Sequence, residues 1–238
     1  MRDLRTGRSA SCVLLFSGGL DSILSAEVLR RAGVDVILLR HHSIFFPLRE
    51  GSYVPPCRSV IRDISGEMVQ LLRDPEYGFG SNANPCLDCK QMMYGKAWQE
   101  AERQDADFIA TGEVLGQRPM SQHESAFRRM EKGAGVVGYV VRPLSGRLLP
   151  PTIPEQNGLI RRDDLLDISG RSRKRQMDLA DRWGIRHYPS PAGGCRLTDP
   201  HFAERVQALS RLGYMEVPYL AAVRNGRLFE LGEDCFVL

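Results

Sequence analysis

A glycine-rich loop between an apolar run and an amphipathic stretch is the feature that most constrains the fold of this chain. The run Ser11–Phe16 shows no alternation of apolar and polar residues, which is typical of a strand buried on both faces. The loop SGGLDS follows, and from Leu20 to Gly33 apolar residues recur at the spacing of one helix face. A second apolar run, Val34–Arg40, comes next. Strand, helix and strand in this order predict a βαβ unit in a parallel sheet.

The loop has the composition of a phosphate-binding site. Consecutive glycines, Gly18 and Gly19, let backbone N–H groups turn outward, and the helix N-terminus adds partial positive charge. Ser17 and Ser22 add hydroxyl donors. Asp21 repels phosphate unless a cation lies between them, so it predicts a bound Mg²⁺. The loop matches neither the common NTPase loop nor G-x-G-x-x-G. A turn that only ends a strand is the plain alternative.

The rest of the chain continues the α/β pattern as far as a proline-rich break. Further strands are expected at Asp105–Thr111 and Gly138–Ser145, and helices at Ser59–Gly78 and Leu87–Arg103. Three prolines between Leu148 and Gly158 suggest a boundary near residue 150. We therefore expect an α/β domain with the phosphate-binding loop over 1–150 and a smaller α+β region over 151–238.

The region after residue 150 is expected to contain two helices and a hairpin. Arg173–Ile185 and Asp199–Gly213 have helical patterns, and the last twenty residues read as strands with an Asn-Gly turn. The stretch Arg161–Gln176 is rich in arginine. It predicts contact with an RNA backbone, with a solvated helix face as the alternative.

Bulk composition limits the class of protein. The chain has 238 residues, a net charge of +3 and no apolar run near the roughly 20 residues of a membrane span. Its first residues, MRDLRTGRSA, lack the apolar stretch of a signal peptide. We expect a cytoplasmic protein with no membrane partner.

The six cysteines favour ligating or reactive thiols over disulfides. Cys12 and Cys235 are expected to pack as small apolar residues, and Cys57 is left without a role. Cys86 and Cys89 form a C-x-x-C at a predicted helix start, where thiol pKa values fall. The remaining cysteine, Cys195, follows two glycines. The histidines show no metal-ligand spacing, so a cysteine-only site is favoured, while zinc stays open.

The loop SGGLDS resembles the PP-loop motif of the ATP pyrophosphatase superfamily. Its members cleave ATP between the α- and β-phosphates, adenylylate a carbonyl oxygen and release pyrophosphate. The resemblance implies that ATP is bound by Ser17, Gly18, Gly19, Asp21 and Ser22. It also implies that adenine lies near Arg40–His41. Thr111, Gly112 and Glu113, at the end of a strand, are expected to contact ATP, with a plain turn as the alternative.

Four stretches resemble the tRNA thiouridylases of that superfamily: NPCLDCK, ATGEVLGQRPMSQ, VVRPLS and PAGGCRLTD. The resemblance implies ATP-dependent sulfur transfer to a uridine in tRNA, with Asp21, Cys89 and Cys195 as catalytic residues. It also implies a [4Fe–4S] cluster on Cys86, Cys89 and Cys195, and a persulfide on Cys89 or Cys195 is the alternative. Arg142 is expected to contact phosphate or RNA, and Gln117 and Gln122 to contact nucleotide or RNA.

The partners implied are tRNA and a sulfur donor, either a cysteine desulfurase or inorganic sulfide, and a homodimer stays open. Two other functions remain. One is a PP-loop enzyme that thiolates or amidates a small molecule, such as a cofactor sulfur transferase or a deazaguanine synthase. The other is a catalytically idle RNA-binding protein, which the intact Asp21 and the three cysteines argue against.

Overall fold

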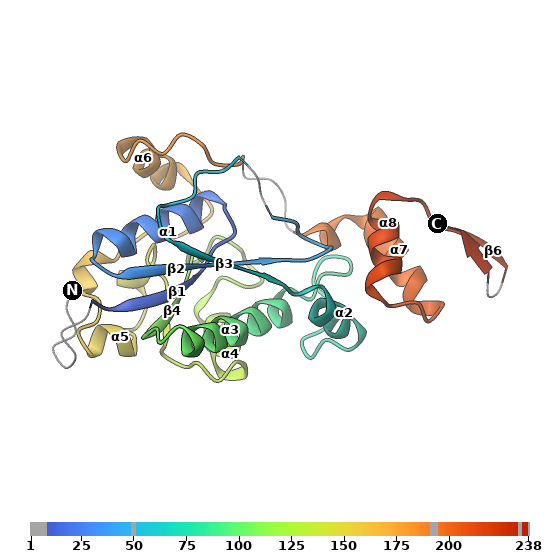
Figure 1. The fold of residues 1–238 in the computed structure, drawn as a ribbon, viewed down its shortest axis with the longest axis horizontal. Coiled ribbons are helices and arrows are strands. Elements are labelled where there is room, and N and C mark those ends of the chain that lie inside the picture. Colours follow the sequence, from blue (N-terminus) through green and yellow to red (C-terminus); the bar gives the residue numbers. More distant parts are fainter. Residues whose placement is uncertain (1–8, 49–50, 191–194, 233–234, 238) are drawn as a thin grey trace. The chain divides into compact units, whose positions relative to one another are not determined.

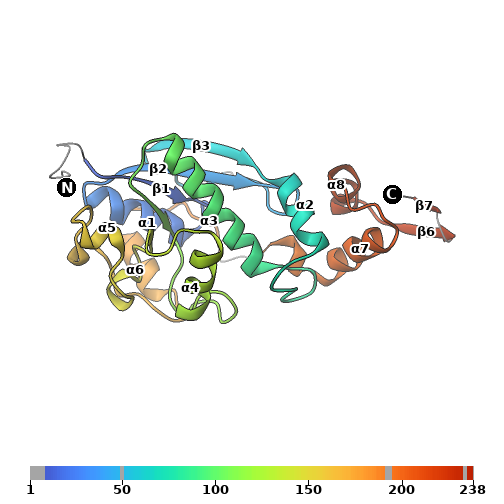
Figure 2. The ribbon, with the colours of Figure 1, turned by 90° about the horizontal axis from the view of Figure 1, so that it is seen from below.

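A parallel sheet forms the centre of the fold. The computed structural model describes residues 9–48, 51–190, 195–232 and 235–237. Among these, five strands lie in the order β3-β2-β1-β4-β5 (Figure 1). Their bounds are β1 Ser11–Leu15, β2 Asp35–His42, β3 Arg58–Asp63, β4 Phe108–Thr111 and β5 Val140–Val141. β1 pairs in parallel with β2 and β4, β4 pairs in parallel with β5, and the arrow of β3 follows that of β2 (Figure 2). The predicted α/β class with an open parallel sheet is confirmed.

Burial explains which runs became central strands. Cys12, Val13 and Leu14 of β1 have no exposed surface, and β1 has a hydrogen-bonded neighbour on each side. The edge strand β3 is exposed along most of its length, and Ile61 is 47% exposed there. The continuous apolar run therefore lies at the covered centre of the sheet, and the strand with more polar residues lies at its edge.

The order of the strands places a switch point beside β1. The chain moves outward from β1 to β2 and β3, then returns to form β4 on the other side of β1. The carboxyl ends of β1 and β4 are therefore neighbours whose connections leave in opposite directions. In open α/β sheets, ligands bind at this position.

Helices cover both faces of the sheet. α1 (Leu20–Arg31) and α6 (Lys174–Arg182) lie on one face, and α3 (Cys86–Arg103) and α4 (Glu124–Gly133) lie on the other (Figure 1). α1 and α6 pack against each other, and Leu24 and Ala180 share the core with the strands. The chain also forms a short helix α5 (Ile153–Gln156) and 3-10 turns at Gly146–Leu148 and Arg162–Asp164.

The chain divides into two compact units, each assembled from separate segments. The first comprises Met1–His41, Leu48–Ile61 and Lys90–Pro191, and the second comprises His42–Pro47, Arg62–Cys89 and Ala192–Leu238. The division therefore does not fall near residue 150. Residues after 150 stay with the sheet because Ile160, Leu165 and Ile168 are buried in its core.

The second unit is built mainly from helices. It contains α2 (Ser65–Arg73), a 3-10 turn at Arg196–Thr198, α7 (Pro200–Arg211), α8 (Val217–Asn225) and the antiparallel pair β6 (Phe229–Gly232) and β7 (Cys235–Val237). The rings of Phe45 and Phe202 pack with their centroids 6.1 Å apart. Of the region 151–238 that the sequence predicts, residues up to Pro191 belong to the first unit, and the second unit adds His42–Pro47 and Arg62–Cys89.

Three expected elements are wrong in part. The stretch Ser59–Gly78 begins with β3, and its helix starts only at Ser65, because the Asp63 carboxylate accepts a hydrogen bond from Ser65 N–H at 2.8 Å and starts a new element. The expected strand Gly138–Ser145 is reduced to Val140–Val141, since Pro143 has no N–H for a ladder.

The C-terminal Asn-Gly pair also acts differently from the expectation. Val217–Asn225 is a helix with a proline in its first turn, and Leu220 and Val223 form its buried face. Gly226 ends this helix, so the Asn-Gly pair is not the turn of a hairpin. The strands that do form there are β6 and β7 only.

No helix among the residues that the structure describes combines the length and the apolar character needed to cross a membrane.

We predict that Leu14→Ala lowers the free energy of unfolding by about 2–5 kcal/mol, because Leu14 is fully buried in the central strand. Ile61→Ala, at an edge position that is 47% exposed, serves as the control and should cost less than about 1 kcal/mol. Chemical denaturation measures both. Equal losses in the two variants would contradict the placement of β1 at the centre.

Candidate functional site

The glycine loop joins β1 to α1 in a compact turn. Gly18 has a φ of +72°, a conformation that glycine adopts without strain, and Gly19 is the N-cap of α1. The Ser22 hydroxyl donates to Gly19 O at 2.8 Å, and the Ser17 hydroxyl donates to Ser22 Oγ at 3.3 Å. Because the first N–H groups of a helix lack intrahelical partners, this turn offers donors to an anion.

Asp21 lies in the first turn of α1 and is held from two sides. Its Oδ2 atom accepts a hydrogen bond from Gln117 Nε2 at 3.0 Å and lies 3.7 Å from the Arg173 guanidinium. Its Oδ1 atom and the Oε1 atom of Gln117 are buried without a hydrogen-bond partner in the described part of the chain. Two unpaired oxygen acceptors are ligands that suit Mg²⁺, so these residues fit the expected ion.

Gly112 brings the end of β4 against the glycine loop. A Cβ atom on Gly112 would lie 2.8 Å from both the N and Cα atoms of Ser22, so only glycine fits here. Thr111, the last residue of β4, is 2% exposed. The structure thus brings Gly112 to Ser22 as the switch point requires.

The other residues expected at the nucleotide lie at or near the same edge of the sheet. His41 is the penultimate residue of β2, beyond the paired residues Leu15 and Leu39, and it is half-buried. Gln122 is 7% exposed, so its side chain faces the protein interior.

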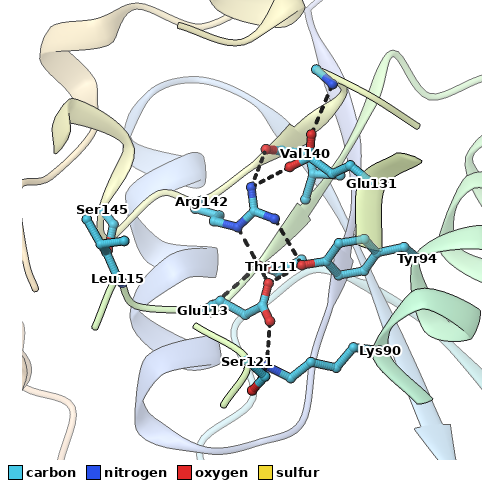
Figure 3. A network of polar contacts seen from close by, with 11 residues as sticks. Lys90, Tyr94, Thr111, Glu113, Leu115, Ser121, Glu131, Val140, Arg142 and Ser145 are labelled. Atoms are coloured by element: carbon cyan, nitrogen blue, oxygen red, sulfur yellow. Dashed lines mark hydrogen bonds and ion pairs between the residues drawn. The ribbon is translucent and has the colours of Figure 1, made fainter. Parts of the chain in front are cut away.

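A buried network of charges beside Thr111 is what the sequence reasoning missed (Figure 3). Glu113 Oε1 accepts a hydrogen bond from Lys90 Nζ at 2.6 Å, and its Oε2 atom accepts one from the Tyr94 hydroxyl. Arg142 Nε lies 3.5 Å from the same Oε2 atom, and its NH1 donates to Glu131 Oε1 at 2.7 Å. The residues come from α3, the segment after β4, the segment after β5, and α4.

The network keeps its carboxylate ionised. Burial alone would raise the pKa of Glu113, but the Lys90 ammonium and the Arg142 guanidinium lower it further than burial raises it. Burial, opposed in part by Arg142, raises the pKa of Tyr94 well above its usual value. Arg142 is 4% exposed and its guanidinium is paired inside this network, while its expected contact with phosphate or RNA stays a prediction. No local sequence signal joins residues this far apart in the chain.

The three cysteines of interest all belong to the second unit. Cys86 starts α3, Cys89 lies one turn further along, and Cys195 precedes the 3-10 turn Arg196–Thr198. Asn82 Nδ2 donates to Thr198 O at 2.8 Å, which ties the loop before Cys86 to the turn after Cys195.

Cys195 has a thiol whose acidity is changed by its surroundings. Burial raises its pKa to about 11, and the nearby Cys86 adds to the shift. Its Sγ lies 3.9 Å from Phe45 O, a weak S–H donor contact. Cys86 and Cys195 are therefore close enough to influence each other electrostatically, and no disulfide joins the described cysteines 12, 57, 86, 89 and 195.

The thiols do not form a metal site as they stand. Within the described residues, no three His, Cys, Asp or Glu side chains are grouped so as to hold a metal ion. Thiolates such as those of Cys86, Cys89 and Cys195 are suitable ligands for an iron–sulfur cluster or zinc. In the described part of this structure, however, the three thiols are not grouped as a metal site.

Most arginines of the basic stretch Arg161–Gln176 form ion pairs within the protein. Four of its arginines pair with carboxylates, namely Arg161 with Asp163, Arg162 with Glu155, Arg173 with Asp21 and Arg175 with Asp167. Arg171 and Lys174 are exposed, and neither has a carboxylate partner in the described ranges. This stretch lies in the first unit, whereas residues 192–238 hold five arginines, no lysine and six acidic residues. Surplus positive charge therefore lies beside α6 and not in the C-terminal segment.

Comparison with known proteins finds relatives among tRNA-thiolating enzymes. No protein-family model matches the sequence. A probable tRNA sulfurtransferase of Methanosarcina mazei is 30% identical over 128 residues, which cover 48% of this chain and 30% of that protein. A tRNA-specific 2-thiouridylase MnmA of Clostridium acetobutylicum is 33% identical over 122 residues, which cover 42% of this chain and 34% of that protein. The matched region spans about a third of the length of these relatives.

Solved structures of related shape share little sequence. A crystal structure of a 4-thiouridine synthetase–RNA complex with bound ATP has a TM-score of 0.47 at 17% identity, covering 90% of this chain and 52% of that one. A subunit assigned to a tRNA methyltransferase of Methanocaldococcus jannaschii has a TM-score of 0.41 at 19% identity, covering 56% and 68%.

The motif, its place at the switch point of a parallel sheet and the sequence relatives agree with one another. Over 42–48% of its length the chain is therefore similar to tRNA sulfurtransferases and 2-thiouridylases, and its glycine loop lies where a PP-loop would lie.

Proposed function

We propose that this protein transfers sulfur to a uridine in tRNA in an ATP-dependent reaction. The observation that carries the proposal is the switch-point loop, in which Asp21 presents an unpaired, buried carboxylate oxygen beside a helix N-terminus. The relatives that bear the names tRNA sulfurtransferase and 2-thiouridylase support the choice of substrate.

The reaction proposed balances as an exchange of oxygen for sulfur. The uridine carbonyl oxygen attacks the α-phosphate of ATP, the bond between the α- and β-phosphates breaks, and pyrophosphate leaves. Sulfide from the sulfur donor then attacks the ring carbon, the bond from that carbon to the former carbonyl oxygen breaks, the oxygen leaves as part of AMP, and the proton of the sulfide passes to solvent. The products are thiouridine, AMP and pyrophosphate.

The loop residues bind and orient the phosphates in this proposal. N–H groups of Gly18 and Gly19 and the hydroxyl of Ser17 donate to the phosphate that will leave. A Mg²⁺ ion held by Asp21 would neutralise the charge that develops on the phosphates. Arg173 lies beside Asp21, so we assign it to the phosphates and not to the RNA surface that the sequence suggests.

Cys86, Cys89 and Cys195 are the residues that would hold a [4Fe–4S] cluster in this proposal. With three thiolate ligands, such a cluster would have one iron without a protein ligand, which would supply a place for sulfide. The shared unit, the influence of Cys86 on Cys195 and the Asn82–Thr198 hydrogen bond support the grouping. The thiols must move closer than in this structure, and the cluster must lower the pKa of Cys195 from about 11. A persulfide on Cys89 or Cys195 is the alternative.

Asp21→Asn should lower tRNA-dependent pyrophosphate release by at least about a hundredfold, because an amide is a poor ligand for Mg²⁺ between two phosphates. Asp163→Asn is the control, since that side chain is 83% exposed. Pyrophosphate is measured with and without tRNA, and circular dichroism checks the fold. Full activity of Asp21→Asn at ordinary Mg²⁺ would defeat the assignment of the loop. Pyrophosphate release at the same rate with and without tRNA would favour a small-molecule substrate.

The double variant Arg171→Ala, Lys174→Ala should reduce the slope of log affinity for tRNA against log salt by about 1.4–1.8, because each lost phosphate contact removes about 0.7–0.9. Arg103→Ala with Arg128→Ala removes the same charge from α3 and α4, which cover the opposite face of the sheet (Figure 1). That control should leave the slope unchanged. Equal slopes in all three proteins would mean that the stretch is only a solvated surface.

Protein purified without oxygen should contain iron and acid-labile sulfide and absorb visible light. Cys86→Ser, Cys89→Ser and Cys195→Ser should each lose the cluster, whereas Cys57→Ser, at a half-buried cysteine in the other unit, should keep it. If a colourless protein still thiolates tRNA, the cluster hypothesis is wrong and the persulfide route is favoured. Stoichiometric zinc without thiolation would defeat both routes.

A further inference from the structure

The buried network around Glu113 touches no part of the proposed reaction directly. Glu113 is 8% exposed and accepts from Lys90 and Tyr94, with Arg142 at 3.5 Å (Figure 3). Lys90 Nζ also donates to Ser121 Oγ at 3.0 Å. Every oxygen of the carboxylate therefore has a cationic or hydroxyl partner: Lys90 and Tyr94 come from α3, and Arg142 comes from the segment after β5.

The position of Glu113 in the chain gives the network a consequence at the glycine loop. Glu113 follows Gly112, whose backbone touches Ser22 so closely that a Cβ atom would lie 2.8 Å from Ser22 N and 3.0 Å from Asp21 C. Thr111 precedes Gly112 in the chain. Its Oγ1 atom donates to Glu113 Oε2 at 3.2 Å and accepts from Glu113 N–H at 3.3 Å. The carboxylate thus fixes three successive residues, and the middle one supports the first turn of α1.

Such a support differs from ordinary packing. The segment after β4 has left the sheet, so strand pairing no longer holds Gly112, and glycine has the greatest freedom of any residue. An anchor on the adjacent residue restricts that freedom. A displacement of about 1 Å at the first turn of α1 would move the N–H groups of the loop away from the phosphates, which suffices for large losses.

We infer that Glu113 is a positioning residue for the nucleotide: held by Lys90, Tyr94 and Arg142, it keeps Gly112 against Ser22 and so shapes the glycine loop for ATP. This inference rests on the proposed function, because it requires that the loop binds ATP. It explains why a glycine and a buried carboxylate follow each other at the end of β4.

Glu113→Gln tests the inference against Glu131→Gln as a matched control. Glu131 is also a partly buried carboxylate that pairs with Arg142, at 2.7 Å, but its other partner is Gly138 N–H at 3.1 Å and not the end of β4. Both changes leave Arg142 with one charged partner fewer. The dissociation constant for Mg-ATP of the full chain is measured by calorimetry, the KM and kcat of pyrophosphate release by kinetics, and the melting temperature by circular dichroism.

We expect Glu113→Gln to raise the dissociation constant and the KM for ATP by about tenfold or more, with a smaller change in kcat, because the reacting groups are still present. Glu131→Gln should stay within about twofold of the wild type in ATP affinity, even if its melting temperature falls as much as that of Glu113→Gln. Should Glu113→Gln fail to fold, Tyr94→Phe removes one hydroxyl partner of Glu113, keeps the ring, and should shift ATP affinity in the same direction.

Two outcomes would overturn the inference. Equal ATP affinities of the two glutamine variants would make the network a stabilising element only, as would an unchanged affinity in Tyr94→Phe when Glu113→Gln does not fold. If the wild-type protein itself does not bind Mg-ATP, the proposed function fails first and the inference fails with it. The wild-type measurement therefore tells the two failures apart.

Discussion

The close backbone approach of Gly112 to Ser22 is the constraint on which the candidate site depends. It holds the end of β4 against the start of α1, with no space for a side chain between them. Because β1 is paired with both β2 and β4, the loop emerges where connections leave in opposite directions. The buried charges around Glu113 then fix the one segment of this junction that no strand pairing holds. An anion site made mainly of backbone N–H groups needs such rigidity, because it binds the anion only when those N–H groups point at it.

The sulfur chemistry rests on a less complete arrangement. Cys86, Cys89 and Cys195 share a unit, and the Asn82–Thr198 hydrogen bond links their segments, yet the thiols do not form a metal site in the described structure. Burial raises the pKa of Cys195 to about 11, so its thiolate is harder to form than that of an exposed cysteine. A ligand that binds thiolates, or a protein that delivers sulfur, has to supply the energy to remove the thiol proton. The surplus positive charge near α6, where we propose the RNA contact, lies in the unit that also carries the loop.

Local patterns in the sequence predict the parallel sheet, the glycine loop and most helices, because these depend on neighbours along the chain. Ser11–Phe16 and Val34–Arg40 are nearly the observed β1 and β2. The helix at Val217–Asn225 was missed because a proline in its first turn and a terminal Asn-Gly pair are also signals of turns. Long-range ion pairs leave no local signal, so neither the burial of Arg142 nor the pairing of Arg173 with Asp21 was expected. The residues 191–194 that precede Cys195 lie outside the described part of the chain.

Nucleoside analysis of tRNA tests the central claim most directly. A strain without the protein is compared with the same strain carrying the wild-type chain or Asp21→Asn, and tRNA nucleosides are measured by mass spectrometry. The account predicts that one thiouridine is missing in the strain without the protein, returns with the wild type and stays missing with Asp21→Asn. An identical set of thiolated nucleosides in all strains would contradict it.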